Sequence, residues 1–556
     1  MKDLIRAARG EALADLVLKG ANIVNVYSGG ILKGDIAIKD GVIVGIGEYD
    51  GKSAIDTKGA YVAPGLIDSH IHIESSMLTP SEFAWALAPT GVTTVIADPH
   101  EIANVLGVDG INYMIEDSAG APVDIKYMLP SCVPATFYET SGAVIDSKIT
   151  QREILRADIL GLGEMMNFPG VLFTDPEVTA KIAAAKSAGK IIDGHAPALT
   201  GKELNAYVLA GIGTEHEAFT LKEAEEKLAL GMYILIREGS AAKNLNELIP
   251  LAKGEGYRRL MFCSDDLHPF DLINRGSINY PVKLAISRGI DPVRAITIAT
   301  LNAAECYSLK DRGAIAPGKI ADMIIFDNFE DMNISTVIKS GKVTVSQGKT
   351  LYDAPAKKAY NISGFNLKKI TADDIKLNFK RDKINVIGII PDSIVTDNLL
   401  IDKSDIGDTS KIAVIERHRN TGNIGVGLVK GYNISGGAVA TSIAHDSHNI
   451  IAIGDNDTDI VNAVNKLIDI KGGIVISAGG KIIKCLSLPV AGLMSDKRIE
   501  DVNNNYEELT IIARKMGVPE GVHPFMTLSF LALPVIPHLK ITDKGLFDAD
   551  RFEFIN

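Results

Sequence analysis

The sequence predicts an α/β protein: a closed, TIM-like (β/α)8 barrel with a small composite β-sandwich and a C-terminal α/β domain. Three observations lead to this prediction. Short apolar runs alternate with helical stretches through the middle of the chain. Segments of β type flank that middle on both sides, and further strands and a helix follow it. The chain also has 556 residues, too many for one hydrophobic core at roughly 150 residues per domain.

Eight apolar runs in the middle of the chain are predicted to be the barrel strands. They are GLIDSHIH, GVTTVIADP, IKYMLPSC, ILGLGEMM, KIIDGHAP, GIGTEHEA, MYILIREGS and RRLMFCSDD. Helices are expected between them: Thr79 as N-cap, Pro80 at the first helical position and Glu82 closing a capping box predict one helix start. Residues 291–309 have helical periodicity after the last strand. We place the barrel at residues 63–309.

The flanking β segments are predicted to form one β-sandwich assembled from both sides of the barrel. Apolar runs punctuated by Gly and Asp fill residues 15–62, and a related signature returns at residues 313–327. We therefore assign the N-terminal segment 1–62 and residues 310–360 to the sandwich. Residues 361–556 are assigned to the C-terminal α/β domain, with strands such as KINVIGII, KIAVIERH and GIVISAGG and the helix DTDIVNAVNKLIDI.

The charge and hydropathy of the chain limit the kinds of partner and environment that are expected for it. The chain has 57 basic and 69 acidic residues, a formal net charge of -12 and no basic block, so no nucleic acid is expected as a partner, although this does not exclude a free base. The first 20 residues are charged throughout, which predicts no secretory signal. Prolines at 524, 534 and 537 interrupt the most apolar late stretch, which argues against a membrane helix and for a buried, irregular segment.

The cysteines predict neither a zinc knuckle nor a disulfide framework. They lie far apart and show no C-x-x-C spacing: Cys132, Cys263, Cys306 and Cys485. Reduced thiols in a cytoplasmic protein are the expectation.

Polar residues at the predicted strand ends are the main indication of function. His70 and His72 end the first strand and, being two residues apart, face the same way. The fourth, fifth, sixth and eighth strands end in Glu164, His195, His216 and Asp265-Asp266. In a barrel these ends converge on one pocket. Four histidines and two carboxylates are enough there for two divalent ions, with one carboxylate bridging them.

Each of these residues alone has an ordinary explanation. A single histidine at a strand end is usually a hydrogen-bonded structural residue, Glu164 could belong to a buried ion pair, and Asp265 could cap the next helix. The joint pattern is harder to explain in this way, because six of the eleven histidines follow apolar β runs in the order that a barrel site requires. The metal site is therefore the preferred interpretation.

Several motifs carry a family resemblance. APGLIDSHIHIESS, the late SDD and GAIAPGKIADMIIFD resemble the amidohydrolase superfamily of metal-dependent hydrolase barrels. GVTTVIADPHEIANV, LPSCVPAT, GLGEMMNFPGV, DGHAP, GTEHE, CSDDLHP and AHDSHN resemble, within it, the adenine deaminase family, and the resemblance spans almost the whole chain. Many superfamily members have a carboxylated lysine where this chain has Glu164, which counts against a dihydroorotase or a hydantoinase.

The resemblance implies a binuclear centre and a reaction. His70 and His72 would share one metal with Asp265, Glu164 would bridge, and His195 and His216 would hold the second metal. The implied metals are manganese or iron, which suit oxygen and imidazole ligands without thiolate. The implied reaction is the hydrolytic deamination of adenine to hypoxanthine and ammonia by a metal-bound hydroxide, as in purine salvage. A homo-oligomer, with a dimer as the simplest form, is also expected.

Further residues are candidates for proton transfer and purine binding. Attack at C6 places charge on N1, and the amine must be protonated before it leaves. Asp265 is predicted to shuttle the proton, and either Glu74 or Glu238 to act as the acid at N1, because burial can raise a carboxyl pKa. The candidates for holding the purine are Glu74, His100, Glu101, Glu238, Asp266 and His268, with His448 on a loop over the barrel mouth. The alternative for each is an ordinary loop charge or a surface turn.

Two other functions stay open at this point. The chain could be an amidohydrolase that acts on another amino-purine or on a cyclic amide. It could also be a non-catalytic protein that binds metal or purine on the same scaffold. The complete ligand set argues against the second alternative, because decayed enzymes commonly lose ligands.

Overall fold

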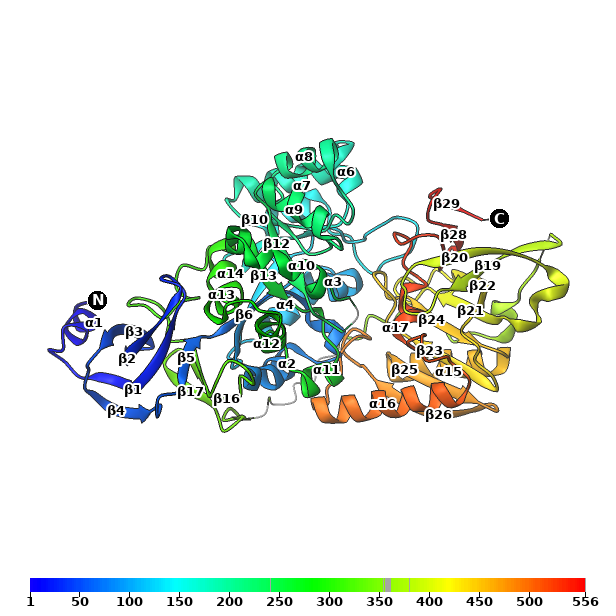
Figure 1. Cartoon of the computed structure of the whole chain (residues 1–556). Helices are drawn as coiled ribbons and strands as arrows, with labels where there is room; N and C mark the ends of the chain where they lie inside the picture. Colours follow the sequence, from blue (N-terminus) through cyan, green and yellow to red (C-terminus); the bar gives the residue numbers. More distant parts are fainter. Residues whose placement is uncertain (241, 354, 356–361, 380, 556) are drawn as a thin grey trace.

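The computed structural model describes residues 1–240, 242–353, 355, 362–379 and 381–555. Three groups of elements follow one another across the molecule: a sheet of N-terminal strands in blue, a central barrel, and a C-terminal domain in yellow to red (Figure 1). The predicted border between residues 360 and 361 lies outside the described residues. This border and the borders predicted after residues 62 and 309 stay predictions.

Eight strands, β6 to β13, form the barrel in the described part of the chain, and the predicted barrel fold is confirmed. One arc contains, in spatial order, β10 (Ile191–Gly194), β9 (Ile159–Met165), β8 (Asp124–Leu129), β7 (Val92–Ala97), β6 (Leu66–His72) and β14 (Asp265–Asp266). The other arc contains β11 (Thr214–Glu215), β12 (Tyr233–Arg237) and β13 (Leu260–Cys263). The paired strands run parallel, and β6 and β7 are buried along their whole length. Such strands are covered on both faces, which explains their apolar runs.

Hydrogen bonds close the barrel where the two arcs meet. The Gly213 N–H donates to the Ile192 carbonyl at 3.0 Å, which joins the β10 side to the β11 side. At the other junction β14, two residues beyond β13, pairs in parallel with β6, with Asp265 opposite Ile71. All the carboxyl ends therefore point to one mouth.

Helices connect the barrel strands and surround them. They are α2 (Pro80–Leu87), α3 (His100–Leu106), α4 (Val108–Asp117), α5 (Ser147–Glu153), α6 (Phe168–Leu172), α7 (Pro176–Ser187), α8 (Gly201–Ala210), α9 (Leu221–Ala229), α10 (Leu245–Leu248), α11 (Pro269–Asn274), α12 (Asn279–Ser287), α13 (Pro292–Ile298) and α14 (Leu301–Cys306). The helical segment predicted at residues 291–309 is two helices, because Thr300 has φ -141° and ψ -78°, outside the helical region.

The start of α2 differs from its prediction in one detail. Thr79 is the N-cap and Pro80 is the first helical residue, as predicted, but the Thr79 side chain makes no capping hydrogen bond. The prediction of a capping box was wrong, because the Glu82 carboxylate turns away from Thr79 and contacts the C-terminal domain. It pairs with Arg498 and accepts a hydrogen bond from the Ile499 N–H at 3.1 Å, at the start of α16 (Ile499–Lys515). A charged partner and a free helix N-terminus hold a carboxylate better than one backbone N–H does.

The flanking segments form one sheet, which confirms that the β unit is assembled from both sides of the barrel. Within the described residues it contains β1 (Ala14–Asn25), β2 (Gly30–Lys39), β3 (Val42–Gly47), β4 (Gly51–Asp56), β5 (Tyr61–Pro64), β15 (Met323–Phe326), β16 (Ile334–Lys339), β17 (Lys342–Ser346) and β18 (Lys349–Thr350). The two parts meet where β5 pairs antiparallel with β15, with Ala63 opposite Ile324. Leu18, Ile36 and Ile338 lie together in its core. The short helix α1 (Lys2–Ala8) precedes β1.

The C-terminal domain is built on a second sheet, as predicted. In spatial order its strands in the described residues are β20 (Thr396–Asp402), β19 (Lys383–Ile389), β22 (Ile424–Lys430), β21 (Ser410–Ile415), β24 (Ile450–Gly454), β23 (Gly437–Thr441), β25 (Gly473–Ala478) and β26 (Lys481–Ser487). Helix α15 (Asp457–Ile470) buries Val464 and Leu467 against this sheet. The domain also contains α17 (Met526–Phe530), β27 (Leu539–Thr542), β28 (Gly545–Asp548) and β29 (Glu553–Phe554).

Two further features concern the helices and the cysteines. None of the helices in the described ranges combines the length and the apolar character that a bilayer span demands. The cysteines are free thiols, and those at 132, 263 and 306 are buried.

Candidate metal centre and active site

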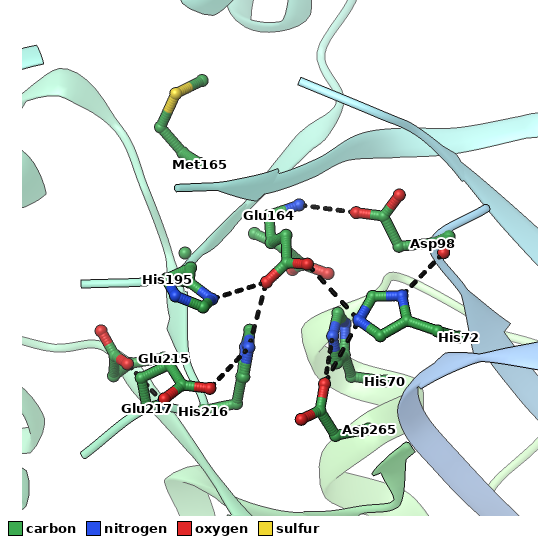
Figure 2. Close-up of polar contacts among 12 residues, drawn as sticks. His70, His72, Asp98, Glu164, Met165, His195, Glu215, His216, Glu217 and Asp265 are labelled. Carbon is green, nitrogen blue, oxygen red and sulfur yellow. Dashed lines mark hydrogen bonds and ion pairs between the residues drawn. The ribbon is translucent and has the colours of Figure 1, made fainter. Parts of the chain in front are cut away.

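The six predicted ligands meet at the mouth of the barrel (Figure 2). His70 and His72 lie at the end of β6, where the two-residue spacing places their rings on the same side, with centroids 4.8 Å apart. Glu164 comes from the end of β9 and Asp265 from β14, and two more histidines follow β10 and β11. The pattern of strand ends therefore brings together side chains that lie up to 195 residues apart in sequence, as between His70 and Asp265.

Glu164 lies at the centre of the group. Its Oε2 atom is 2.8 Å from His195 Nδ1 and 3.1 Å from His216 Nε2. Its Oε1 atom is 3.4 Å from His72 Nε2. One carboxylate oxygen thus faces each half of the ligand set, which is the arrangement of a bridging ligand.

Asp265 completes the half formed by His70 and His72. Its Oδ1 atom lies 3.3 Å from His70 Nε2 and 3.2 Å from His72 Nε2. Arg237 donates to its Oδ2 atom at 2.7 Å. Asp265 has a φ of 60°, in the left-handed region that few side chains adopt. Backbone strain of this kind persists where surrounding structure holds a functional residue in place.

The donor set fits metal ions. His70 Nε2 and His216 Nε2 are buried and have no hydrogen-bond partner in the described part of the chain, although each lies close to a carboxylate. Ligand atoms lie within 4.8 Å of one another in the group His70, His72 and Asp265 and in the group His70, Glu164 and His216. Buried imidazole nitrogens that face carboxylates without hydrogen bonding to them suit a cation between the two.

The electrostatics of the group also favour bound positive charge. Burial and the neighbouring His216 imidazole lower the pKa of His70 to about 4, which favours the neutral imidazole that a metal ligand requires. Burial disfavours a charged His216, yet the adjacent Glu164 carboxylate raises its pKa to about 9. Burial favours neutral Glu164, but His195 and the other facing histidines hold its pKa well below the ordinary value. Metal binding at this group therefore displaces protons.

Asp98, at the end of β7, supports the ligands and was missed by sequence reasoning. Its Oδ2 atom accepts a hydrogen bond from the Glu164 N–H at 2.9 Å. Its backbone carbonyl lies 2.9 Å from His72 Nδ1. Because a carbonyl only accepts, the proton of the His72 ring is on Nδ1, and Nε2 is free to act as a ligand. A carboxylate directly after a buried strand was the available signal.

Arg237 and Glu217 were also missed. Arg237 ends β12 and pairs with both Asp265 and Glu217, and Glu217 Oε1 lies 3.6 Å from His216 Nε2. Although burial favours the neutral acid, the charge of Arg237 holds the pKa of Asp265 well below its ordinary value. Sequence reasoning selected the next residue, Glu238. Adjacent strand residues point to opposite faces, so Arg237 and Glu238 do not share a face. Following the alternation of faces along β12 would have found Arg237.

Glu238 lies apart from the ligands. Its backbone pairs with that of Lys243, and the charges that act on its carboxyl come from Lys243, Arg275 and Asp271. It is also absent from the lining of the cavity described next.

A cavity lies between the barrel mouth and the C-terminal domain. The barrel contributes mainly polar side chains, and five predicted substrate or catalytic residues are among the lining: Glu74, Glu101, Asp266, His268 and His448. The C-terminal domain contributes many apolar side chains, including Ile443, Leu493, Phe525, Met526 and Phe530. An apolar pocket with a few polar groups on one wall is typical of a site for a small planar ligand. The stretch from residue 524, predicted to be buried and irregular, forms part of this wall and includes the short helix α17.

Glu74 has the features of a neutral acid in this cavity. The residue is buried, and its Oε1 atom accepts a hydrogen bond from the Ile102 N–H at 3.0 Å. Its Oε2 atom has no hydrogen-bond partner among the described residues. Burial raises the pKa of Glu74 to about 7, and the nearby charge of Glu101 acts in the same direction.

The AHDSHN loop reaches the barrel and contacts Glu101. His448 Nε2 and His445 Nδ1 both lie against the Glu101 carboxylate. His100 lies between two carboxylates, with Nε2 at 3.4 Å from Glu101 Oε1 and Nδ1 at 3.1 Å from Glu164 Oε1. The loop is therefore connected to the candidate ligands through Glu101 and His100. His445 was not among the predicted residues, because its position depends on how the two domains pack.

The last two predicted residues, Asp266 and His268, lie on the barrel side of the same cavity. Ser75 donates a hydrogen bond to Asp266. The His268 ring contacts Tyr506, with centroids 5.9 Å apart, and burial lowers the pKa of His268.

Comparison with known proteins agrees with this architecture. The family model described as "Amidohydrolase family" matches residues 61–344, and the model described as "Adenine deaminase C-terminal domain" matches residues 392–553. The adenine deaminase of Clostridium acetobutylicum is 48% identical, with 100% of each chain covered. Adenine deaminase 2 of Carboxydothermus hydrogenoformans is 47% identical, covering 100% of this chain and 99% of the relative. With such identity along its whole length, this chain belongs to the adenine deaminase family of amidohydrolases.

Proposed function

We propose that this protein hydrolyses adenine to hypoxanthine and ammonia, the deamination expected of an enzyme of purine salvage. One observation supports the proposal most directly: the set of four histidines and two carboxylates, all buried except the partly exposed His195, lies next to a cavity between a polar wall and an apolar wall. The relatives named adenine deaminase match this chain along its whole length.

The residues divide into two metal-holding groups. His70, His72 and Asp265 would hold one divalent ion, His195 and His216 the other, and Glu164 would bridge them. Manganese and iron suit these nitrogen and oxygen donors. When bound, such ions supply Lewis acidity, which lowers the pKa of a coordinated water from 15.7 to about 7.

Asp265 is placed to move the proton between water and the leaving amine. Its Oδ1 atom faces the two histidines of β6, and its Oδ2 atom is held by Arg237. Arg237 also keeps the carboxylate ionised, as a base requires. Asp265 takes a proton from the attacking water and returns it to the exocyclic nitrogen of adenine, so that ammonia leaves as a neutral molecule.

Glu74 is the candidate for the hydrogen bond to N1 of the purine. The Ile102 N–H fixes its Oε1 atom, and its Oε2 atom is left without a partner among the described residues. A ring that enters the cavity between the apolar side chains Ile443, Met526 and Phe530 would meet Glu74 on the polar wall. Glu74 donates to N1 as electron density builds up there during attack at C6.

The central test is metal removal and reconstitution. Chelated, metal-free protein is expected to lose adenine turnover and to regain it when reloaded with manganese or iron. Zinc is the comparison metal, and hypoxanthine formation is followed by ultraviolet absorbance. A metal-free chain that deaminates adenine at the full rate, or a reloaded chain that binds two metal equivalents without any turnover, would contradict the proposal.

A pair of glutamate variants tests the assignment at N1. Glu74→Gln is expected to lower kcat by about 10²–10⁴-fold, the usual contribution of a positioned acid. Glu238→Gln is the matched control, because Glu238 is partly buried but lies outside the cavity lining, and its kcat should stay near the wild-type value. The reverse ranking, measured at saturating adenine, would assign the acid to Glu238.

Assembly and location are further proposals. A homodimer, which the family resemblance implies, can be measured by light scattering of the purified chain. Free thiols at all four cysteines are consistent with a cytoplasmic enzyme.

A further inference from the structure

His195 is the least enclosed of the six candidate ligands. Its side chain is 27% exposed, whereas that of His216 is 2% exposed and that of Glu164 is 3% exposed. Strand β10 ends at Gly194, so His195 lies just beyond the sheet. Its ring position therefore depends on what holds the backbone around it.

A buried ion pair holds that backbone on one side. Lys227 of α9 and Glu215 of β11 both have fully buried side chains, and Lys227 Nζ lies 3.1 Å from Glu215 Oε2. Lys227 donates to the Ala196 carbonyl at 2.7 Å, and the Ala196 N–H donates to Glu215 Oε2 at 3.1 Å. The ion pair therefore holds both backbone polar groups of the residue that follows His195.

The Glu215 carboxylate also holds the backbone next to His216. Glu215 Oε1 accepts a hydrogen bond from the Glu217 N–H at 2.6 Å, and Glu217 is the residue that follows His216. One carboxylate thus fixes the backbone after both histidines of the second metal group. In Figure 2 Glu215 lies beside Glu217 and His216, on the side of the centre away from Asp265.

Burying the Lys227–Glu215 ion pair costs desolvation free energy, which argues for a role other than stabilising the fold. A buried ammonium has three protons to satisfy, and Lys227 meets this need with the Ala196 carbonyl, Glu215 and Glu223, the last at 2.6 Å. Apolar residues of similar volume usually stabilise a core as well as a buried ion pair does. What apolar residues cannot do is hold the two backbone segments in one register through directed hydrogen bonds.

We propose that Lys227 and Glu215 are positioning residues for the half of the metal centre formed by His195 and His216. The inference rests on the proposed binuclear function. Neither residue touches metal or substrate; both act through the backbone that carries the two ligands. Outer-shell partners of this kind typically contribute about 10–100-fold to metal affinity.

The test is a manganese titration of a variant that loses both charges. In Glu215→Gln/Lys227→Met both charges of the pair are removed, and the Glu223 carboxylate keeps its hydrogen bond from the Ala198 N–H at 2.9 Å, so the barrel is expected to fold. The first manganese equivalent should bind with wild-type affinity, and the second about 10–100-fold more weakly. Glu215→Gln alone, in which Lys227 keeps Glu223 as its counter-ion, should weaken the second equivalent in the same direction.

A second buried ion pair provides the matched control. Lys339 and Asp322 are buried, with Nζ 2.7 Å from Oδ2, in the β unit away from the centre. Lys339→Met/Asp322→Asn should lower thermal stability without changing either manganese affinity. Folded Glu215 and Lys227 variants that bind both equivalents as tightly as the wild type would overturn the positioning role alone. A wild-type chain that binds fewer than two equivalents would overturn the binuclear proposal, and this inference with it.

Discussion

Replacing Asp265 by Asn is expected to lower kcat for adenine by about 10²–10⁴-fold, the range for loss of a positioned general acid–base group. The variant keeps the shape of the side chain but cannot take a proton from water at neutral pH. It also keeps the backbone, because Asn tolerates the left-handed φ of 60° that Asp265 adopts. The measurement is kcat at saturating adenine, with metal content determined on the same sample.

The control for this variant is Asp459→Asn. Asp459 is a buried carboxylate on α15 that accepts a hydrogen bond from Ser477 at 2.6 Å, in the other domain. Its replacement should affect stability while kcat stays unchanged. Turnover of Asp265→Asn at the wild-type rate, with both metals bound, would remove Asp265 from the proton pathway.

Glu164→Gln is expected to have the largest effect on metal content. Glu164 is the residue that contacts both halves of the ligand set, through Oε1 towards His72 and through Oε2 towards His195 and His216. A neutral amide cannot bridge two cations, so the loss of affinity should exceed the roughly 10–100-fold typical of an outer-shell partner. Protein purified from manganese-supplemented cells should contain little bound metal by elemental analysis and show no measurable turnover.

Glu82→Gln provides the comparison for Glu164→Gln. Glu82 is a buried glutamate that pairs with Arg498, away from the ligands, and its replacement should leave metal content unchanged. Two tightly bound manganese ions in purified Glu164→Gln would show that Glu164 is not the bridge.

The ligand set was predictable because it depends on strand order and strand ends. A run of apolar residues identifies a barrel strand, and the barrel then places polar residues near the carboxyl end of that strand at the mouth, whatever the distance in sequence. His70, His195 and His216 follow this rule, and none required knowledge of side-chain packing. The composite sheet was predictable for a similar reason, since two β segments that flank a closed barrel each offer a strand edge with which the other can pair, as β5 and β15 do.

Residues whose roles depend on local direction or on domain packing were not predictable. Glu238 was selected because it follows the seventh predicted strand, and Arg237 was not considered, but one step along a strand turns the side chain to the other face. The capping box at Glu82 followed a sound local rule, yet Arg498 and the start of α16 offered stronger partners. The contact of His445 with Glu101 joins residues far apart in sequence, and no local sequence pattern predicts it.

The apolar wall of the cavity comes from residues after 440, although all six predicted metal ligands lie before residue 266. During synthesis these six residues can therefore leave the ribosome before the apolar wall exists. A chain that stops before α17 would keep the six predicted ligands but would lack Met526 and Phe530, two of the side chains that line the cavity. The compartment proposed for the purine ring is thus completed only after residue 530 has been synthesised.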